Sequence, residues 1–209
     1  MKVLMLNGGW RAEGNSDFML DHMAEVLAEE GIETEVFQIG PAPVRDCMGC
    51  NKCSETGRCV FTDDGVDAFL DKAEEADGFV FATPVYYAHP SGRILSFLDR
   101  AFYAAKRNVF YGKPGCAVSV ARRSGTTATM DVMNKYFTIS GMPVASSFYW
   151  NASHGFTPED LMRDEEGMRT LRMLARNLAW LLKCIEAGKA AGIELPAPES
   201  GNMTHFIMR

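Results

Sequence analysis

Short apolar segments alternate with stretches of helical periodicity along this chain, and this alternation limits its fold more than any other feature. Five predicted strands span residues 3–7, 34–39, 78–83, 116–121 and 144–149. Apolar residues at helical spacing follow each strand and predict helices over residues 16–30, about 62–76, 91–105, 126–140 and 158–187. Strands that are apolar on both faces and joined by helices favour a doubly wound parallel sheet with helices on both faces. Ligands are then expected beyond the carboxyl ends of the strands.

The periodicity predicts a single domain over residues 1–187. No internal repeat, low-complexity tract or linker divides that stretch. Residues 188–209 contain Pro196, Pro198 and Gly201 and have no periodic pattern. This irregular tail is either a frayed end or an arm that wraps on a partner.

Composition excludes several classes of function. The 209 residues carry a formal net charge of −6, so there is no basic surface to neutralise many phosphates and we expect no nucleic-acid partner. The longest apolar runs are far shorter than the roughly 20 residues of a membrane helix, so no membrane role is expected. The chain enters a strand-like run at once without a cleavable leader, which predicts a cytoplasmic protein.

The junction between the first strand and its helix has the features of a phosphate-binding loop. Gly9 and Gly14 permit tight turns, and Asn15 and Ser16 place polar side chains at a helix N-terminus, where the dipole favours anions. The spacing is similar to a triphosphate-binding loop, but the lysine that such a loop requires is absent, and so is G-x-G-x-x-G. The loop therefore suits a monophosphate, unless it is only a polar turn with a good helix cap.

Two further strands end in segments suited to a flat aromatic ligand. Tyr86 and Tyr87 lie between prolines after the third strand, where they would form a rigid ledge for a heteroaromatic ring, or simply pack on the next helix. Residues 121–127 follow the fourth strand and offer guanidinium and N–H groups that would stabilise negative charge, or form a solvated loop. Because all three loops belong to one edge of the sheet, we expect them to form a single site.

The sequence resembles the NAD(P)H-dependent FMN reductase branch of flavodoxin-like proteins, and more narrowly the iron–sulfur flavoproteins. The matching segments are LNGGWRAEGNS at 6–16, CMGCNKC and a further Cys followed by DD within 47–64, ADGFVFATPVYYAHPSG at 76–92, and LDR at 98–100. The resemblance implies a five-stranded sheet in the order 2-1-3-4-5. The family usually has Ser where this chain has Gly9, which removes one hydroxyl donor.

The resemblance also implies which residues bind FMN. The phosphate would be held by Gly9, Arg11, Gly14, Asn15 and Ser16. The ribityl chain and isoalloxazine would be lined by Pro84, Val85, Tyr86 and Tyr87. The pyrimidine side of the flavin would face the turn that contains Ala121, Arg122, Ser124, Gly125 and Thr126.

Four cysteines form a motif of their own. Cys47, Cys50, Cys53 and Cys59 fall within thirteen residues, a spacing suited to four thiolates around a [4Fe–4S] cluster. A structural zinc site and a metal-free loop that packs around the flavin pocket are the alternatives. The motif would lie at the flavin edge or across a subunit interface from it. The remaining cysteines, Cys116 and Cys184, are predicted to be core thiols.

The implied activity is that of an FMN-dependent oxidoreductase. Hydride from NAD(P)H would pass to N5 of FMN, and a small-molecule acceptor such as a quinone, free flavin, metal or nitro compound would take the electrons. The alternatives are an electron carrier that takes electrons from ferredoxin through a [4Fe–4S] cluster to FMN, and a flavin-binding interaction module. No catalytic side chain is expected, since the flavin carries the chemistry.

The expected partners and local pairings complete the set of predictions. Several aromatic residues are expected to be exposed, which predicts a homodimer or homotetramer. The second subunit would complete the ligand site, which is only an open shelf at the edge of one sheet. The aromatic residues are Trp10, Tyr86, Tyr87, Tyr103 and Trp150. Asp99 and Arg100 are predicted to fix a helix end by a local ion pair.

Overall fold

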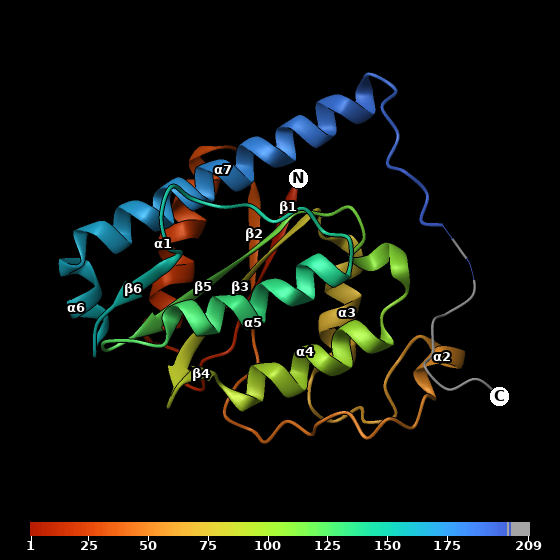
Figure 1. Cartoon of the computed structure of the whole chain (residues 1–209), viewed down its shortest axis with the longest axis horizontal. Coiled ribbons are helices and arrows are strands. Elements are labelled where there is room, and N and C mark those ends of the chain that lie inside the picture. Colours follow the sequence, from red (N-terminus) through yellow and green to blue (C-terminus); the bar gives the residue numbers. More distant parts are fainter. Residues whose placement is uncertain (200, 202–209) are drawn as a thin grey trace.

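The computed structural model describes residues 1–199 and 201, and it has one mixed sheet at its centre (Figure 1). Five strands run parallel in the order β2-β1-β3-β5-β6. Their bounds are β1 Lys2–Asn7, β2 Glu33–Gln38, β3 Gly78–Tyr86, β5 Gly115–Ala121 and β6 Ala152–His154. The two-residue strand β4, His89–Pro90, pairs antiparallel with the end of β3. With this short hairpin set aside, the order equals the predicted 2-1-3-4-5, and the doubly wound fold is confirmed.

Helices cover both faces of the sheet (Figure 1). One face carries α1 Asn15–Glu29, α6 Pro158–Arg163 and α7 Glu165–Ala190. The opposite face carries α3 Val66–Glu75, α4 Gly92–Ala104 and α5 Thr126–Ile139. A short helix, α2 Cys53–Thr56, follows β2, and the 3-10 turn η1 Arg107–Val109 follows α4 and buries Val109 in the second core. None of the helices in the described residues is long and apolar enough to cross a bilayer.

Each central strand supplies apolar residues to two separate cores. In β1, Val3 and Met5 pack toward α1 and α7, whereas Leu4 and Leu6 pack toward α3 and α4. All four are fully buried, because alternate side chains of a strand point to opposite faces and both faces are covered. The core beneath α3, α4 and α5 is rich in phenylalanine, and the Phe81 ring stacks on Phe137 at a centroid distance of 5.0 Å.

The predicted fifth strand at residues 144–149 is wrong. Val144 makes only an isolated parallel bridge with Gly115, and the fifth position in the sheet is occupied by β6 beside Ser119. The Ser147 hydroxyl accepts a hydrogen bond from the Tyr149 N–H at 3.2 Å and is 2.7 Å from the side-chain oxygen of Asn151. These local bonds fold the segment into a turn and compete with extended pairing.

The long helix predicted over residues 158–187 is two helices in the structure. Asp164 separates them, and its carboxylate accepts hydrogen bonds from the N–H groups of Gly167 at 3.0 Å and His154 at 2.8 Å. The first of these bonds caps α7, and the second ties that helix to β6. Helix α7 continues to Ala190, beyond the predicted end, and exposes Cys184. The prediction of Cys184 as a core thiol is therefore wrong, whereas Cys116 is buried.

The tail is described only in part. Residues 191–199 form no helix or strand, and the Tyr111 hydroxyl donates a hydrogen bond of 2.7 Å to the carbonyl of Pro196. Residues 200 and 202–209, the rest of the predicted irregular tail, lie outside the described residues.

Asp164 makes the stability of the protein dependent on pH. Burial tends to raise the pKa of this carboxyl, but the N–H groups of Gly167 and His154 outweigh it and hold the pKa below its ordinary value. The stabilisation is then present above the unfolded-state pKa of about 3.9 and is lost as the pH falls through the lower folded-state value. We expect Asp164→Asn to lower the free energy of unfolding by about 1–2 kcal/mol at pH 7, with a smaller loss at pH 3.

Urea unfolding of both proteins at the two pH values measures this difference. The exposed Asp131 of α5, changed to Asn, is the control and is expected to show little effect at either pH. An equal loss for Asp164→Asn at pH 7 and pH 3 would contradict the role given to its charge.

Candidate functional site

A cleft with a volume of about 250 Å³ lies at the carboxyl ends of β1, β3 and β5. It is the place where a doubly wound sheet is expected to bind its ligand, since the chain leaves β1 and β3 in diverging directions. The lining residues are Gly9, Trp10, Arg11, Gly14, Asn15, Ser16, Pro84, Val85, Tyr86, Val120, Ala121, Arg122, Gly155 and Phe156.

The loop after β1 is fixed to the sheet by short hydrogen bonds. The Gly8 N–H donates to the carbonyl of Ala82 on the neighbouring strand at 2.8 Å. The side chain of Asn7, fully buried, accepts from the Gly9 N–H at 2.9 Å and donates to Asp17 of α1 at 3.2 Å. Asn7 therefore holds both ends of the loop in place before any ligand binds.

The cleft is built for an anion. Within the described residues, the N–H groups of Asn15, Ser16 and Asp17 at the start of α1 have no hydrogen-bond acceptor, and Gly14 provides no side-chain cap. The only charged residues in the lining are Arg11 and Arg122, although the chain as a whole is acidic. Free amides at a helix N-terminus together with two guanidinium groups fit a phosphate.

Asn15 has a second role that the sequence did not suggest. Its side-chain amide donates to the carbonyl of Gly155 at 3.1 Å, so it connects the start of α1 to the segment after β6. Ser16 is 3% exposed and lies next to Gly9, where an added Cβ would be 3.6 Å from its hydroxyl. Gly9 stands where the family usually has a serine, and its lack of a side chain leaves the floor of the cleft open.

Four of the predicted flavin-binding residues do not line the cleft, namely Tyr87, Ser124, Gly125 and Thr126. Tyr87 has a positive φ of 63° at the tip of the β3–β4 hairpin, and its side chain is fully exposed. At Gly125, where φ is 97°, an added Cβ would lie 2.7 Å from Val85. Gly125 therefore packs behind the cleft wall and lets the loop before α5 support it.

Four lining residues were missed by the sequence analysis as parts of the site. Trp10 and Phe156 form half-exposed to exposed aromatic surfaces, and Val120 and Gly155 complete the wall. The Arg11 guanidinium lies 5.0 Å from the centre of the Trp10 ring. A tryptophan inside a glycine-rich loop was the available signal for Trp10, whereas Phe156 was hidden by the misplaced fifth strand.

The four clustered cysteines border a second, small cavity. Cys47, Cys50, Cys53 and Cys59 line it together with Met48, Asn51, Val60, Phe61, Arg100, Tyr103 and Ala104. All four thiols are free. In the described part of the chain, no three His, Cys, Asp or Glu side chains come together closely enough to coordinate one ion. The thiols therefore surround a shared space rather than a single point.

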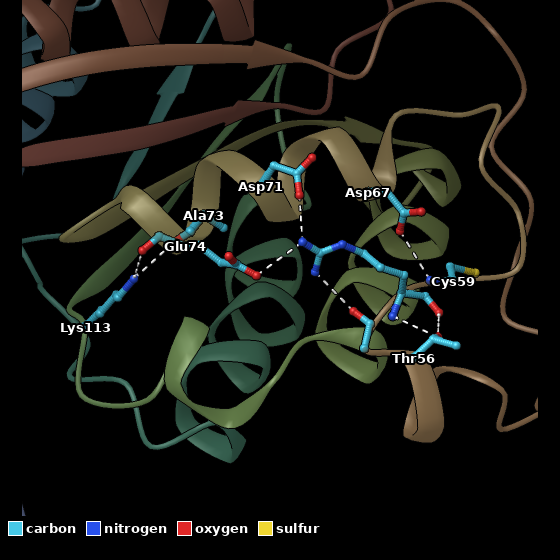
Figure 2. A network of polar contacts seen from close by, with 9 residues as sticks. Thr56, Cys59, Asp67, Asp71, Ala73, Glu74 and Lys113 are labelled. Carbon is cyan, nitrogen blue, oxygen red and sulfur yellow. Dashed lines mark hydrogen bonds and ion pairs between the residues drawn. The ribbon is translucent and has the colours of Figure 1, made fainter.

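The cysteine loop is anchored to α3 on one side (Figure 2). The Cys59 N–H donates to the carboxylate of Asp67 at 3.2 Å. The guanidinium of Arg58 pairs with Asp71 at 2.6 Å and Glu74 at 3.2 Å. These contacts fix the position of Cys59, whereas Cys47 and Cys50 are exposed in the segment that leads into α2.

Arg100 anchors the same loop from α4, and here the predicted local pair with Asp99 is wrong. Arg100 is 1% exposed and forms an ion pair with Asp64, whereas Asp99 accepts a hydrogen bond from the Tyr136 hydroxyl. The Nε–H of Arg100 points to the Cys59 sulfur at 3.2 Å. Adjacent residues of a helix point in different directions, so Arg100 points into the protein beneath the cysteine loop while Asp99 points toward Tyr136. This is why the two side chains do not pair.

The start of α4 adjoins the loop that lines the cleft, and residues near its end border the cysteine cavity. Ser91, which caps the start of α4, donates to the carbonyl of Gly8 in the cleft loop, whereas Tyr103 near the helix end contacts Cys53. The thirteen residues of α4 span about 20 Å at 1.5 Å per residue. The lining of the cysteine cavity shares no residue with that of the cleft, so within one chain the four cysteines do not border the cleft itself.

Fold and cleft together define a flavodoxin-like, FMN-dependent oxidoreductase. Residues 1–157 match the family described as NADPH-dependent FMN reductase, and the chain belongs to this family. An iron-sulfur flavoprotein of Methanocaldococcus jannaschii is 33% identical, over 89% of this chain and 100% of that protein. An iron-sulfur flavoprotein of Methanosarcina thermophila is 29% identical, over 90% and 99%. An archaeal flavodoxin superposes with a TM-score of 0.58 at 14% identity, over 88% and 99%, which shows the fold.

Removing the two polar side chains at the start of α1 tests the phosphate site. Asn15→Ala combined with Ser16→Ala removes two hydrogen-bonding groups of about 1 kcal/mol each, so we expect FMN to bind roughly 30-fold more weakly. Fluorescence titration of the FMN-free protein measures the affinity. Asp21→Ala, on the exposed side of the same helix, is the control. Unchanged FMN affinity in the double variant would mean that these two side chains do not contact the phosphate.

Proposed function

We propose that this oxidoreductase holds FMN in the cleft and a [4Fe–4S] cluster on Cys47, Cys50, Cys53 and Cys59, and that it moves electrons from a ferredoxin-type donor to a small acceptor. The observation that carries the proposal is the set of four free thiols around one cavity. Two relatives whose names contain "iron-sulfur flavoprotein" align with nearly the whole chain, which supports it.

The residues of the cleft fit FMN. The free N–H groups of α1 with Arg11 would hold the phosphate, and Pro84, Val85 and Tyr86 form the wall beside which the ring would lie. Arg122, at the end of β5, would place positive charge on the opposite wall. Bound FMN supplies both one-electron and hydride chemistry. The protein's part is to orient the ring and offset its charge, so no side-chain acid or base is required.

The cysteine cavity fits a cluster better than a zinc ion. Four thiolates bind one zinc at about 2.3 Å each and must converge on a point, whereas a cubane takes one thiolate at each of four irons. The four thiols here surround a space lined by apolar groups such as Val60 and Phe61.

All six cysteines of the chain are free, which supports a location in a reducing compartment, the cytoplasm.

A second candidate has NAD(P)H as the electron donor. The family is described as NADPH-dependent, and the cleft is open to solvent beside Trp10, Tyr86 and Phe156, which are 48%, 46% and 75% exposed. Aromatic surfaces at an open cleft would receive a nicotinamide ring or a small acceptor such as a quinone, flavin, metal complex or nitro compound.

A homodimer or homotetramer belongs to the proposal. Within one chain the two sites share no lining residue and are linked by α4, which is about 20 Å long, so a cavity from another subunit would bring a cluster nearer to the flavin. The exposed residues Phe148, Tyr149 and Trp150 offer an apolar surface for such a contact.

Metal content separates the cluster from its alternatives. We expect about four irons per chain and a broad absorption shoulder beneath the flavin bands in protein purified without oxygen. Cys50→Ala is expected to lose most of the iron, because a ligand is removed, whereas Cys184→Ala, on the exposed face of α7, is expected to keep it. One zinc per chain, or FMN without any metal, would overturn the cluster assignment.

Anaerobic stopped-flow spectroscopy separates the two electron donors. We expect reduced ferredoxin to bleach the bound flavin faster than NADH or NADPH does, and Cys50→Ala to slow only the reaction with ferredoxin. The variant keeps the FMN cleft, since Cys50 lies beyond the far end of α4. Faster bleaching by NADPH, unaffected by Cys50→Ala, would favour the second candidate.

A further inference from the structure

Arg100 uses every donor of its buried guanidinium. An arginine has five N–H groups, and Arg100 has five acceptors. They are the Cys59 sulfur at 3.2 Å, the carbonyls of Arg45 at 3.3 Å and Phe61 at 3.0 Å, and both carboxylate oxygens of Asp64. The guanidinium also lies 5.2 Å from the centre of the Phe61 ring.

These contacts join the two ends of the cysteine loop. Arg45 precedes Cys47 by two residues, and Phe61 follows Cys59 by two. Because Arg100 binds the carbonyls at both positions, it closes the loop over α4 in a fixed shape. The Asp64 side chain, only 4% exposed, balances the charge of Arg100 and holds its orientation.

The fifth donor is the unusual one. A thiol sulfur is a weak acceptor, whereas a buried guanidinium N–H usually pairs with oxygen or with an anion. The Nε–H of Arg100 points to the sulfur of Cys59, whereas its other four N–H groups bind oxygen atoms. This arrangement suits a sulfur that carries negative charge, as a metal-bound thiolate does.

We propose that Arg100 is a positioning residue that places the Cys59 sulfur as a cluster ligand and, through its N–H···S hydrogen bond, raises the reduction potential of the cluster. The proposal rests on the cluster proposed above. Reduction adds negative charge to the cluster, and hydrogen bonds to ligand sulfurs are among the factors that set the potential. A donor on a cation stabilises the reduced state more than the oxidised one.

Replacing Arg100 with lysine tests this role. Arg100→Lys keeps a positive charge beside Asp64 but cannot form the fork of five hydrogen bonds, so the contact with the sulfur is lost. We expect the variant to retain iron and to show a lower midpoint potential than the unmodified protein in an anaerobic spectroelectrochemical titration. Arg93→Lys is the matched control, since Arg93 lies on the same helix, binds the carbonyl of Gly40 and does not line the cysteine cavity.

A second variant tests the same role in case Arg100→Lys does not fold. Arg100→Met combined with Asp64→Leu removes both charges together and so avoids leaving one of them buried without a partner. FMN affinity reports on folding in each variant, because the cleft lies at the other end of α4. A lower midpoint potential in this variant with iron retained supports the proposal.

The possible failures can be distinguished. If the unmodified protein contains no iron, the cluster assignment is overturned and this inference falls with it. If the unmodified protein holds iron and the Arg100 variants have the same midpoint potential as Arg93→Lys, the role of Arg100 is overturned and the proposed function is left intact.

Discussion

The close approach of β1, β3 and α4 at Gly8 is the constraint on which both sites depend. The Gly8 N–H is bonded to Ala82 of β3, and an added Cβ would lie 2.6 Å from the Cδ1 of Ile94 in α4. Ser91 reinforces this junction, since its hydroxyl donates to the Gly8 carbonyl and caps the helix. Here the chain leaves neighbouring strands in opposite directions, which opens the cleft. The same junction fixes the origin of α4, whose far end carries the cysteine cavity.

The fold was predictable because the strands are short, apolar on both faces and separated by helical periodicity. Leu4 and Met5 are adjacent in sequence and buried in different cores, a pattern that only a sheet covered on both faces produces. The prediction failed where local side-chain bonds replace regular structure. Ser147 folds its segment into a turn, and Asp164 interrupts a helix whose periodicity continues on both sides. Such bonds leave no periodic trace in a sequence.

The site was predictable in its central part and not at its rim. The glycine-rich loop and the residues after β3 and β5 reach the cleft because parallel strands end at the same edge of the sheet. Phe156 could not be placed, since its position depends on β6, which is only three residues long. The separation of the cysteines from the cleft follows from the length and direction of α4, and no local pattern at Cys47 to Cys59 contains that information.

Arg100 shows why a buried charge is poorly explained by stability alone. Transfer of a guanidinium and a carboxylate out of water costs about as much as their attraction returns, and apolar residues of similar volume often serve the fold as well. What an apolar pair cannot do is bind two carbonyls and a sulfur in fixed directions. The carbonyls of Arg45 and Phe61 flank the four cysteines, so the pair of Arg100 and Asp64 determines the shape of the loop. The pair contributes to the geometry of the loop, and its most direct effect is on the position of the Cys59 sulfur, which the guanidinium contacts.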